Sequence, residues 1–232
     1  PAADLEAGDD VDPGEFTDRL AAGFANMTTA HVTMTADLGA AGSTRGEGDA
    51  DYSADRPAVA MTMSSDMMPG GDGMDVRLVD GVLYLDLGAL SKDKFWKLDL
   101  DDPDSPFGAM GAQLDPQSSV GLLEKGLESV TYVGDEDGLA HYEATVDPEA
   151  LRDAMGPTGA ARGADLPNSF DYDIWLDDQD RVTKLTSTMG DPGSVEMTMS
   201  DFGSDVSIEA PPADQVTEMP DLFGDFSASP KA

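Results

Sequence analysis

The segment "HVTMTADL" (His31–Leu38) decides the fold of this chain, because its residues alternate strictly between apolar and polar. Val32, Met34, Ala36 and Leu38 fall on one face, and His31, Thr33, Thr35 and Asp37 fall on the other. Successive side chains of a β-strand point to opposite faces of its sheet. The segment is therefore predicted to be a strand with one buried and one solvated face.

The same alternation recurs along most of the chain. Short turns such as Asp80-Gly81, Asp137-Gly138 and "DDQDR" (177–181) join neighbouring segments and predict antiparallel hairpins. We expect about ten strands in one meander. The inward positions are Val59, Met61 and Met63; Met74, Val76 and Leu78; Leu83, Leu85 and Leu87; Trp96, Leu98 and Leu100; Ala140, Tyr142, Ala144 and Val146; Phe170, Tyr172, Ile174 and Leu176; and Val195, Met197 and Met199.

The segment "STRGEGDADYS" (Ser43–Ser53) breaks this pattern, because Gly46 and Gly48 stand where apolar side chains are expected. Glycine in a strand often marks a bend or a close approach of another backbone. The segment is predicted to be either such a bend or a weak edge strand. On the polar phase of a later strand, Trp175 is expected to pack under a loop or a terminal segment.

Three Asp-Pro pairs, at residues 12–13, 115–116 and 147–148, predict the starts of three helices. Asp caps free backbone N–H groups, and proline at the first helical position has the required φ. After the first pair, one stripe carries apolar residues at helical spacing. These residues are Phe16, Leu20, Phe24 and Met27. The second and third helices are expected to be shorter, with Val120, Leu123 and Leu127 on one and Leu151 and Met155 on the other.

The charge balance is strongly acidic, with 47 Asp and Glu against 13 Lys and Arg and a net charge of -34. Nucleic acid binding depends on clustered Lys and Arg, so this class of function is excluded. Anionic membrane surfaces would repel the chain. We interpret the acidic surface as solvation or salt adaptation. The absence of cysteine excludes a thiol nucleophile and thiolate metal ligands.

Methionine is concentrated between Ala58 and Met74, where five of seventeen residues are methionine. Thioethers can bind copper(I), or can fill irregular apolar space. Met-Thr-Met spacing at Met61 and Met63, and again at Met197 and Met199, places both thioethers of a pair on the apolar face. Both histidines of the chain are on the polar phase, which favours a core or cavity lining for these four methionines. Met67 and Met68 lie in a turn. Two interpretations remain for them: they line the mouth of a cavity, or they are simply exposed.

Catalytic motifs are absent from the sequence: no G-x-S-x-G, H-E-x-x-H, phosphate loop or G-x-G-x-x-G follows a predicted strand. His31 and His141 would each have to act from the exposed side of a strand. The acidic loops "DLDDPDS" and "GDEDG" lack the EF-hand spacing and are interpreted as solvated turns. The sequence therefore predicts a protein that is not an enzyme and needs no cofactor or metal.

The apolar face of such a sheet is larger than its helices can cover. Ten strands about 4.8 Å apart, each about seven residues long with a rise of roughly 3.3 Å, present about 1,100 Å². Three helices about 18 Å long and about 10 Å wide cover about half of that area. Three arrangements would bury the remaining apolar area. The sheet can close into a barrel, fold into two facing sheets, or curl around the helices and leave a cavity. The inserted helices favour the cavity.

The order of elements, the segment "FDYDIWLDDQDRVTKLTSTM" (170–189) and the closing "VSIEAPPADQV" (206–216) resemble the LppX/LprG-type cell-envelope lipoproteins of actinobacteria. The resemblance spans roughly Glu15 to Val216. It implies an α+β, mainly β fold: a LolA-like half-barrel in which a strongly curved antiparallel sheet wraps around a few helices and encloses an apolar cavity. It also implies a lipid or glycolipid carrier in the extracytoplasmic cell envelope. Its membrane anchor, a lipidated cysteine, is expected just before Pro1.

On this interpretation residues 1–12 are an acidic tether, residues 13–222 form one lipid-binding domain, and residues 223–232 are a disordered tail. We expect a monomer that binds an acylated lipid or glycolipid. Two alternatives remain: a methionine-based copper-binding protein, and a structural or regulatory lipoprotein without a ligand. The residues expected to line the lipid cavity are Leu20, Phe24, Met34, Met61, Met63, Val76, Leu78, Leu85, Leu87, Leu123, Tyr142, Tyr172, Ile174, Met197 and Met199.

Overall fold

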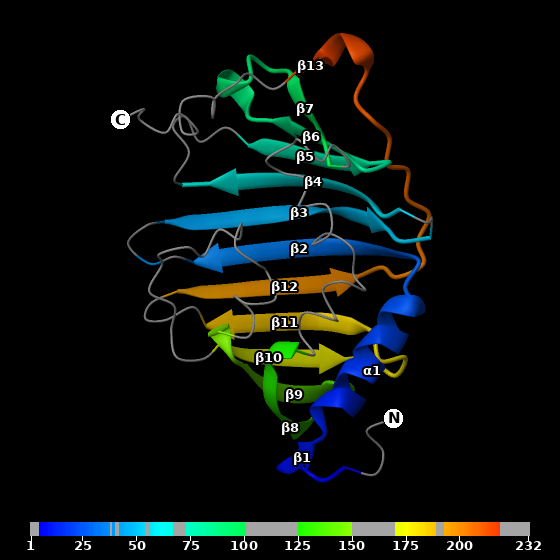
Figure 1. Ribbon diagram of the computed structural model, residues 1–232, viewed down its shortest axis with the longest axis vertical. Helices are drawn as coiled ribbons and strands as arrows, with labels where there is room; N and C mark the ends of the chain where they lie inside the picture. Colours follow the sequence, from blue (N-terminus) through cyan, green and yellow to red (C-terminus); the bar gives the residue numbers. More distant parts are fainter. Residues whose placement is uncertain are drawn as a thin grey trace, which may run out of the picture.

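A computed structural model describes residues 5–37, 39, 42–53, 56–66, 73–100, 125–149, 170–188 and 193–218. In this part of the chain the protein forms one sheet of thirteen strands and one α-helix, α1 (Figure 1). The strand order is β1-β8-β9-β10-β11-β12-β2-β3-β4-β5-β6-β7-β13. The edge strands β1 and β13 lie at opposite ends of the molecule, so the sheet is open (Figure 1).

The strands follow one another mostly as an antiparallel meander, and only the last pair, β13 with β7, is parallel. Two short 3-10 helices, η3 (Gly88–Leu90) and η4 (Ala213–Gln215), complete the described elements. The strands are β1 (Asp9–Val11), β2 (Thr29–Asp37), β3 (Ser43–Asp51), β4 (Ala58–Ser65), β5 (Met74–Val79), β6 (Val82–Asp86), β7 (Phe95–Asp99), β8 (Leu127–Glu136), β9 (Leu139–Val146), β10 (Phe170–Leu176), β11 (Val182–Thr188), β12 (Ser194–Ser200) and β13 (Val216–Glu218).

Thirteen strands replace the expected count of about ten. Residues 9–11 of the expected tether form β1, which pairs with β8. Residues 216–218 form β13, which pairs with β7. A segment of three residues is too short to show a period of two in the sequence. β1 and β13 are strands because each pairs with a longer neighbouring strand. The segment around Gly46 and Gly48 is a full strand, β3, inside the sheet between β2 and β4, so the weak-edge interpretation is wrong.

The helix α1 (Pro13–Ala25) begins where its sequence predicts. The Asp12 carboxylate accepts a hydrogen bond from the Glu15 N–H at 3.0 Å, and Pro13 occupies the first helical position. The helix packs on β8 and β11. Of the two further helices predicted, the one after Asp115 lies outside the described residues up to residue 124. Residues 125 and 126 are helical, but Leu127, which was expected on this helix, is the first residue of β8 and pairs with Val146. Residues 148 and 149 are helical, while residues 150–169 lie outside the described ranges.

The inner face of the sheet, which faces α1, carries the residues that the alternation assigned to it. One register row crosses nine strands from β8 to β5 and shows this directly. It contains Tyr132, Tyr142, Ile174, Leu185, Met197, Met34, Gly46, Met63 and Met74. The neighbouring row on the outer face contains His141, Trp175, Lys184, Thr198, Thr33, Glu47, Thr62 and Asp75.

Gly48 marks a close approach of two strand backbones, as one of the sequence interpretations predicted. A Cβ atom at Gly48 would lie 2.0 Å from the carbonyl oxygen of Ala60 and 2.6 Å from the Cα of Met61. Gly46 is different, because a Cβ there would first meet the flexible side chains of Met63 and Met61, at 3.3 and 3.4 Å. Only glycine therefore fits at position 48 without moving the β4 backbone.

Two parts of the sheet differ in how they bury their inner faces. The first, which we call the covered half, consists of β1, β8, β9, β10 and β11 with α1. Its core is contributed by both helix and strands, and it contains all of the largest fully buried side chains. The second, which we call the methionine half, consists of β12 and β2 to β7. Most of its inner side chains are only half-buried.

Candidate functional site

The residues predicted to line a lipid cavity lie on the inner face of the sheet or on α1, except Leu123, which is outside the described residues. They divide between the two halves. Leu20, Tyr142 and Ile174 are buried core residues of the covered half, where Tyr172 is half-buried. Leu78 and Met199 are buried in the methionine half. The half-buried remainder comprises Phe24, Met34, Met61, Met63, Val76, Leu85, Leu87 and Met197.

The half-buried methionines lie close together because of strand register. Met197 pairs with Met34, and Met63 pairs with Met74. Between these two pairs stands Gly46, over which the ends of Met61 and Met63 lie. Methionine side chains are flexible and polarizable, and adapt to apolar guests of irregular shape. This part of the inner face is therefore uncharged, deformable and not tightly packed.

In the covered half, Arg19 of α1 fastens the helix to the sheet. Its guanidinium donates to Asp180 Oδ1 at 2.5 and 3.0 Å, and to the Tyr142 hydroxyl at 2.6 Å. Burial lowers the pKa of Arg19, but the hydrogen bonds to Asp180 and Tyr142 outweigh it and hold that pKa above its usual value. Burial raises the pKa of Tyr142. Arg19 therefore stays charged and Tyr142 stays neutral at physiological pH.

Aromatic packing completes this fastening. The ring of Phe16 on α1 lies 5.0 Å from the ring of Tyr142, and Tyr132 lies 5.4 Å from Tyr142 on the other strand. These tilted arrangements are the favourable geometry for aromatic pairs. The helix also approaches the β10–β11 turn closely, because a Cβ at Gly23 would lie 2.0 Å from the Asp180 carbonyl oxygen. The covered half is therefore closely packed around Tyr142.

Two hollows are found among the described residues. One, of about 320 Å³, lies beside α1 and is lined by Leu5, Arg19, Tyr132, Asp135, Gly138, Ala140, Leu176, Asp177, Asp178 and Asp180. The other, of about 340 Å³, is lined by three consecutive residues from each of β2, β3 and β4, including Met34 and Met63. Both have polar side chains in their walls, so neither is the apolar cavity that the sequence predicts. That cavity stays a prediction.

Within the described residues, no group of three or more His, Asp or Glu is placed to hold a metal ion. Both histidines lie on the outer face beside carboxylates, His31 with Asp49 at 2.9 Å and His141 with Asp173 at 2.8 Å. Neither can join the inner-face methionines as a copper ligand. None of the helices in the described ranges is long and apolar enough to cross a bilayer.

Comparison with known proteins places the fold. The chain matches none of the protein-family models or curated proteins with which it was compared. Its structure is similar to solved structures of bacterial lipoproteins. One is LppX of Mycobacterium tuberculosis, with a TM-score of 0.58 and 15% identity over 86% of this chain and 100% of that one. Another is LprF of Mycobacterium bovis, with a TM-score of 0.55 and 16% identity over 89% and 99%.

This protein therefore has the fold of the LppX-type lipoproteins, and the resemblance seen in the sequence is confirmed at the level of the fold. The described features agree with that fold in being mostly β, with a single open sheet and a helix on its inner face.

Sequence reasoning missed the residues that hold the covered half together. Arg19 was one basic residue in an acidic chain, and nothing near it in sequence marks Asp180 or Tyr142 as its partners. Trp175 was correctly assigned to the polar face but wrongly expected under a loop. It packs between His141 and Lys184 of the neighbouring strands. Residues directly opposite each other on adjacent strands are close enough for their side chains to be in contact.

Proposed function

We propose that this protein is a non-catalytic carrier that binds an acylated lipid or glycolipid against the inner face of the methionine half. The observation that carries the proposal is the contrast in burial along a single register row. Tyr142 is fully buried and Ile174 nearly so, whereas Met197, Met34 and Met63 farther along the row are only half-buried. Apolar surface left part-exposed on an otherwise highly charged protein is typical of a binding site.

The chemistry of this surface suits acyl chains. Apart from the hydrogen-bonded pair Thr44 and Ser65, the inward residues from β12 to β6 are Met, Val, Leu, Ala and Gly, while the acidic side chains of the same strands project to the other face. Each buried methylene of a chain contributes about 0.8 kcal/mol, so one or two chains provide tight capture. Flexible thioethers accommodate chains of different length and branching.

The location and membrane attachment proposed for the protein follow the same resemblance. The LppX-type fold supports a place in the extracytoplasmic cell envelope, with an anchor through a lipidated cysteine upstream of Pro1. A monomeric carrier of this kind would exchange its lipid with membranes that it reaches through the anchor. The sequence that precedes Pro1 in the gene tests this part directly.

A pair of variants on adjacent residues of β4 tests the carrier function. Met63 points to the inner face and Ser64 to the outer face, where it pairs with Arg45. We expect Met63→Glu to abolish uptake of a fluorescent fatty-acid probe, because a carboxylate in an acyl site must be desolvated. Ser64→Glu places the same charge one residue away and is expected to leave uptake unchanged. Circular dichroism confirms that both variants fold.

Mass spectrometry of an organic extract of the purified protein provides the second readout. A co-purifying acylated lipid supports the proposal. An empty extract together with no probe uptake by the unaltered protein rejects it. Copper(I) titration under reducing conditions tests the methionine alternative, in which Met63→Leu would weaken metal binding but leave probe uptake intact.

A further inference from the structure

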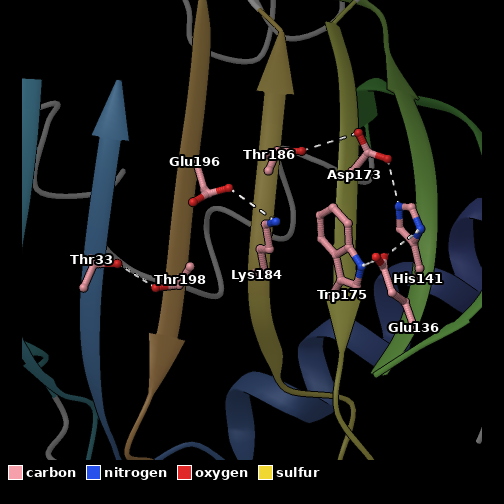
Figure 2. A network of polar contacts seen from close by, with 9 residues as sticks. All are labelled: Thr33, Glu136, His141, Asp173, Trp175, Lys184, Thr186, Glu196 and Thr198. Carbon is pink, nitrogen blue, oxygen red and sulfur yellow. Dashed lines mark hydrogen bonds and ion pairs between the residues drawn. The ribbon is translucent and has the colours of Figure 1, made fainter. Parts of the chain in front are cut away.

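On the outer face of the covered half, His141, Trp175 and Lys184 lie side by side on β9, β10 and β11 (Figure 2). The His141 ring stacks on the Trp175 ring, with ring centroids 4.3 Å apart and planes inclined by 7°. The Lys184 Nζ lies 4.6 Å from the centroid of the same indole. Because β9 and β11 flank β10 on opposite sides, the indole is held between the two side chains.

Each nitrogen of the His141 ring faces a carboxylate. Nε2 lies 2.8 Å from Asp173 Oδ1, and Nδ1 lies 3.9 Å from Glu136 Oε2. The same Glu136 oxygen accepts a hydrogen bond from Trp175 Nε1 at 2.8 Å, as Figure 2 shows. The His141 side chain is only 14% exposed, so these protein groups are its main partners.

A neutral imidazole makes only part of the contacts that this arrangement offers. It carries one N–H, so it donates to one carboxylate and turns a lone pair toward the other. An imidazolium donates from both nitrogens, to Asp173 and toward Glu136, and adds a cation to the face of Trp175. We propose that His141 is a proton-sensitive clasp, whose protonation adds an ion pair with Glu136 to the hydrogen bond that joins Glu136, at the tip of the β8–β9 hairpin, to Trp175 of β10.

The charged groups around His141 come from four strands. β8 contributes Glu136, β9 itself contributes Glu143, and β10 contributes Asp173. An imidazolium at this position lies among these carboxylates. Lys184 of β11 opposes it across the indole, but its charge is shared with Glu196 of β12 at 3.3 Å. Protonation of the imidazole therefore closes the clasp.

The clasp acts on the strands that carry the covered half's core. Next to His141 in β9 is Tyr142, and next to Trp175 in β10 is Ile174; both point inward under α1. Protonation of His141 therefore stabilises this half from its outer side. The inference does not depend on lipid binding.

The chain offers a clean optical test, because it contains two tryptophans and two histidines. Trp96→Phe leaves Trp175 as the only indole. We expect its fluorescence to follow one titration between pH 5 and 8, because a stacked imidazolium quenches indole emission and a neutral ring does not. His31→Gln is the matched control and keeps this titration. His141→Gln abolishes it.

Thermal unfolding gives a second readout. On going from pH 8 to pH 5.5, the melting temperature of the unaltered protein is expected to rise by about 2–4 °C relative to His141→Gln. Glu136→Gln keeps an acceptor for Trp175 but removes the charge, and is expected to reduce this gain.

Two results would overturn the clasp: Trp175 emission that does not change over this pH range, or a titration that survives His141→Gln. If Trp96→Phe fails to fold, the indole N–H resonance of Trp175 in the unaltered protein is followed by NMR instead. The same two criteria apply to it.

Discussion

The covered half and the methionine half belong to one continuous sheet with one alternation pattern, yet they bury it differently. Along the shared register row, the position in β9 is Tyr142, whose side chain is sealed by Phe16 and Arg19 of α1. The equivalent position in β4 is Met63, which is half-buried and lies over Gly46. Among the described residues, the same strand pattern thus supports fully buried side chains under α1, and half-buried methionines beside two smaller buried clusters in the methionine half.

The largest effect expected from this comparison is on stability, from one truncation made in each half. Leu176→Ala in β10 removes a side chain with no exposed surface and is expected to cost about 3–4 kcal/mol in unfolding free energy. Leu85→Ala in β6 removes a half-buried side chain and should cost about 1 kcal/mol. Chemical denaturation measures both. Equal costs would mean that the two halves are packed alike.

A second comparison sharpens the account of β3 within the methionine half. Gly48→Ala would drive its Cβ into the Ala60 carbonyl, and we expect a loss of about 2–3 kcal/mol. Gly46→Ala first meets the side chains of Met63 and Met61, at 3.3 and 3.4 Å, and should change stability by less than about 1 kcal/mol. Both are read from denaturation midpoints. If Gly46→Ala is the more damaging, the close approach of β3 and β4 is not at Gly48.

The fastening of α1 provides the third test. Arg19→Met breaks the hydrogen bonds to Asp180 and Tyr142, and is expected to cost about 2 kcal/mol. In the methionine half, Glu196→Gln breaks the exposed pair with Lys184 and should cost less than about 1 kcal/mol. Native-state hydrogen exchange of α1 amides should rise in Arg19→Met only. Unchanged exchange would show that the aromatic contacts alone hold the helix.

The smallest effect concerns acid and the β10–β11 turn of the covered half. Burial raises the pKa of Asp177, but hydrogen bonds from Arg181 and Gln179 outweigh it and hold the pKa below its usual value. A lowered folded-state pKa stabilises the protein above the unfolded-state value near 4, and this contribution is lost as pH falls through the folded-state pKa.

Asp177→Asn should therefore cost about 1 kcal/mol at pH 7 and progressively less below pH 4. Denaturation at pH 7 and pH 3 measures the difference. A cost that is equal at both values would indicate that the carboxylate charge contributes nothing to the turn.

The alternation of residues was enough to predict the faces of β2, β4, β5, β9, β10 and β12, because a period of two is a local property of the chain. The start of α1 at Asp12-Pro13 was predicted because helix capping also depends on a few neighbouring residues. The edge strands β1 and β13 were missed, since three residues carry no period and depend on pairing to β8 and β7.

The division of the inner face into a filled and a deformable part could not be predicted either. It depends on where α1 packs, and so on contacts such as Arg19 with Asp180 that are 161 residues apart in the chain. The inward positions of the candidate lipid residues were therefore predictable. Which of them are core and which remain half-buried was not.

The most direct test of the central claim is an NMR titration of protein carrying ¹³C-methyl methionine with a soluble fatty acid. The methyl groups of Met34, Met61 and Met63, on the half-buried inner face, are predicted to shift on binding. The methyl group of Met27, which is 4% exposed and packed at the end of α1, is predicted not to shift. Fatty acid that leaves all three inner-face methyls unmoved would contradict the account.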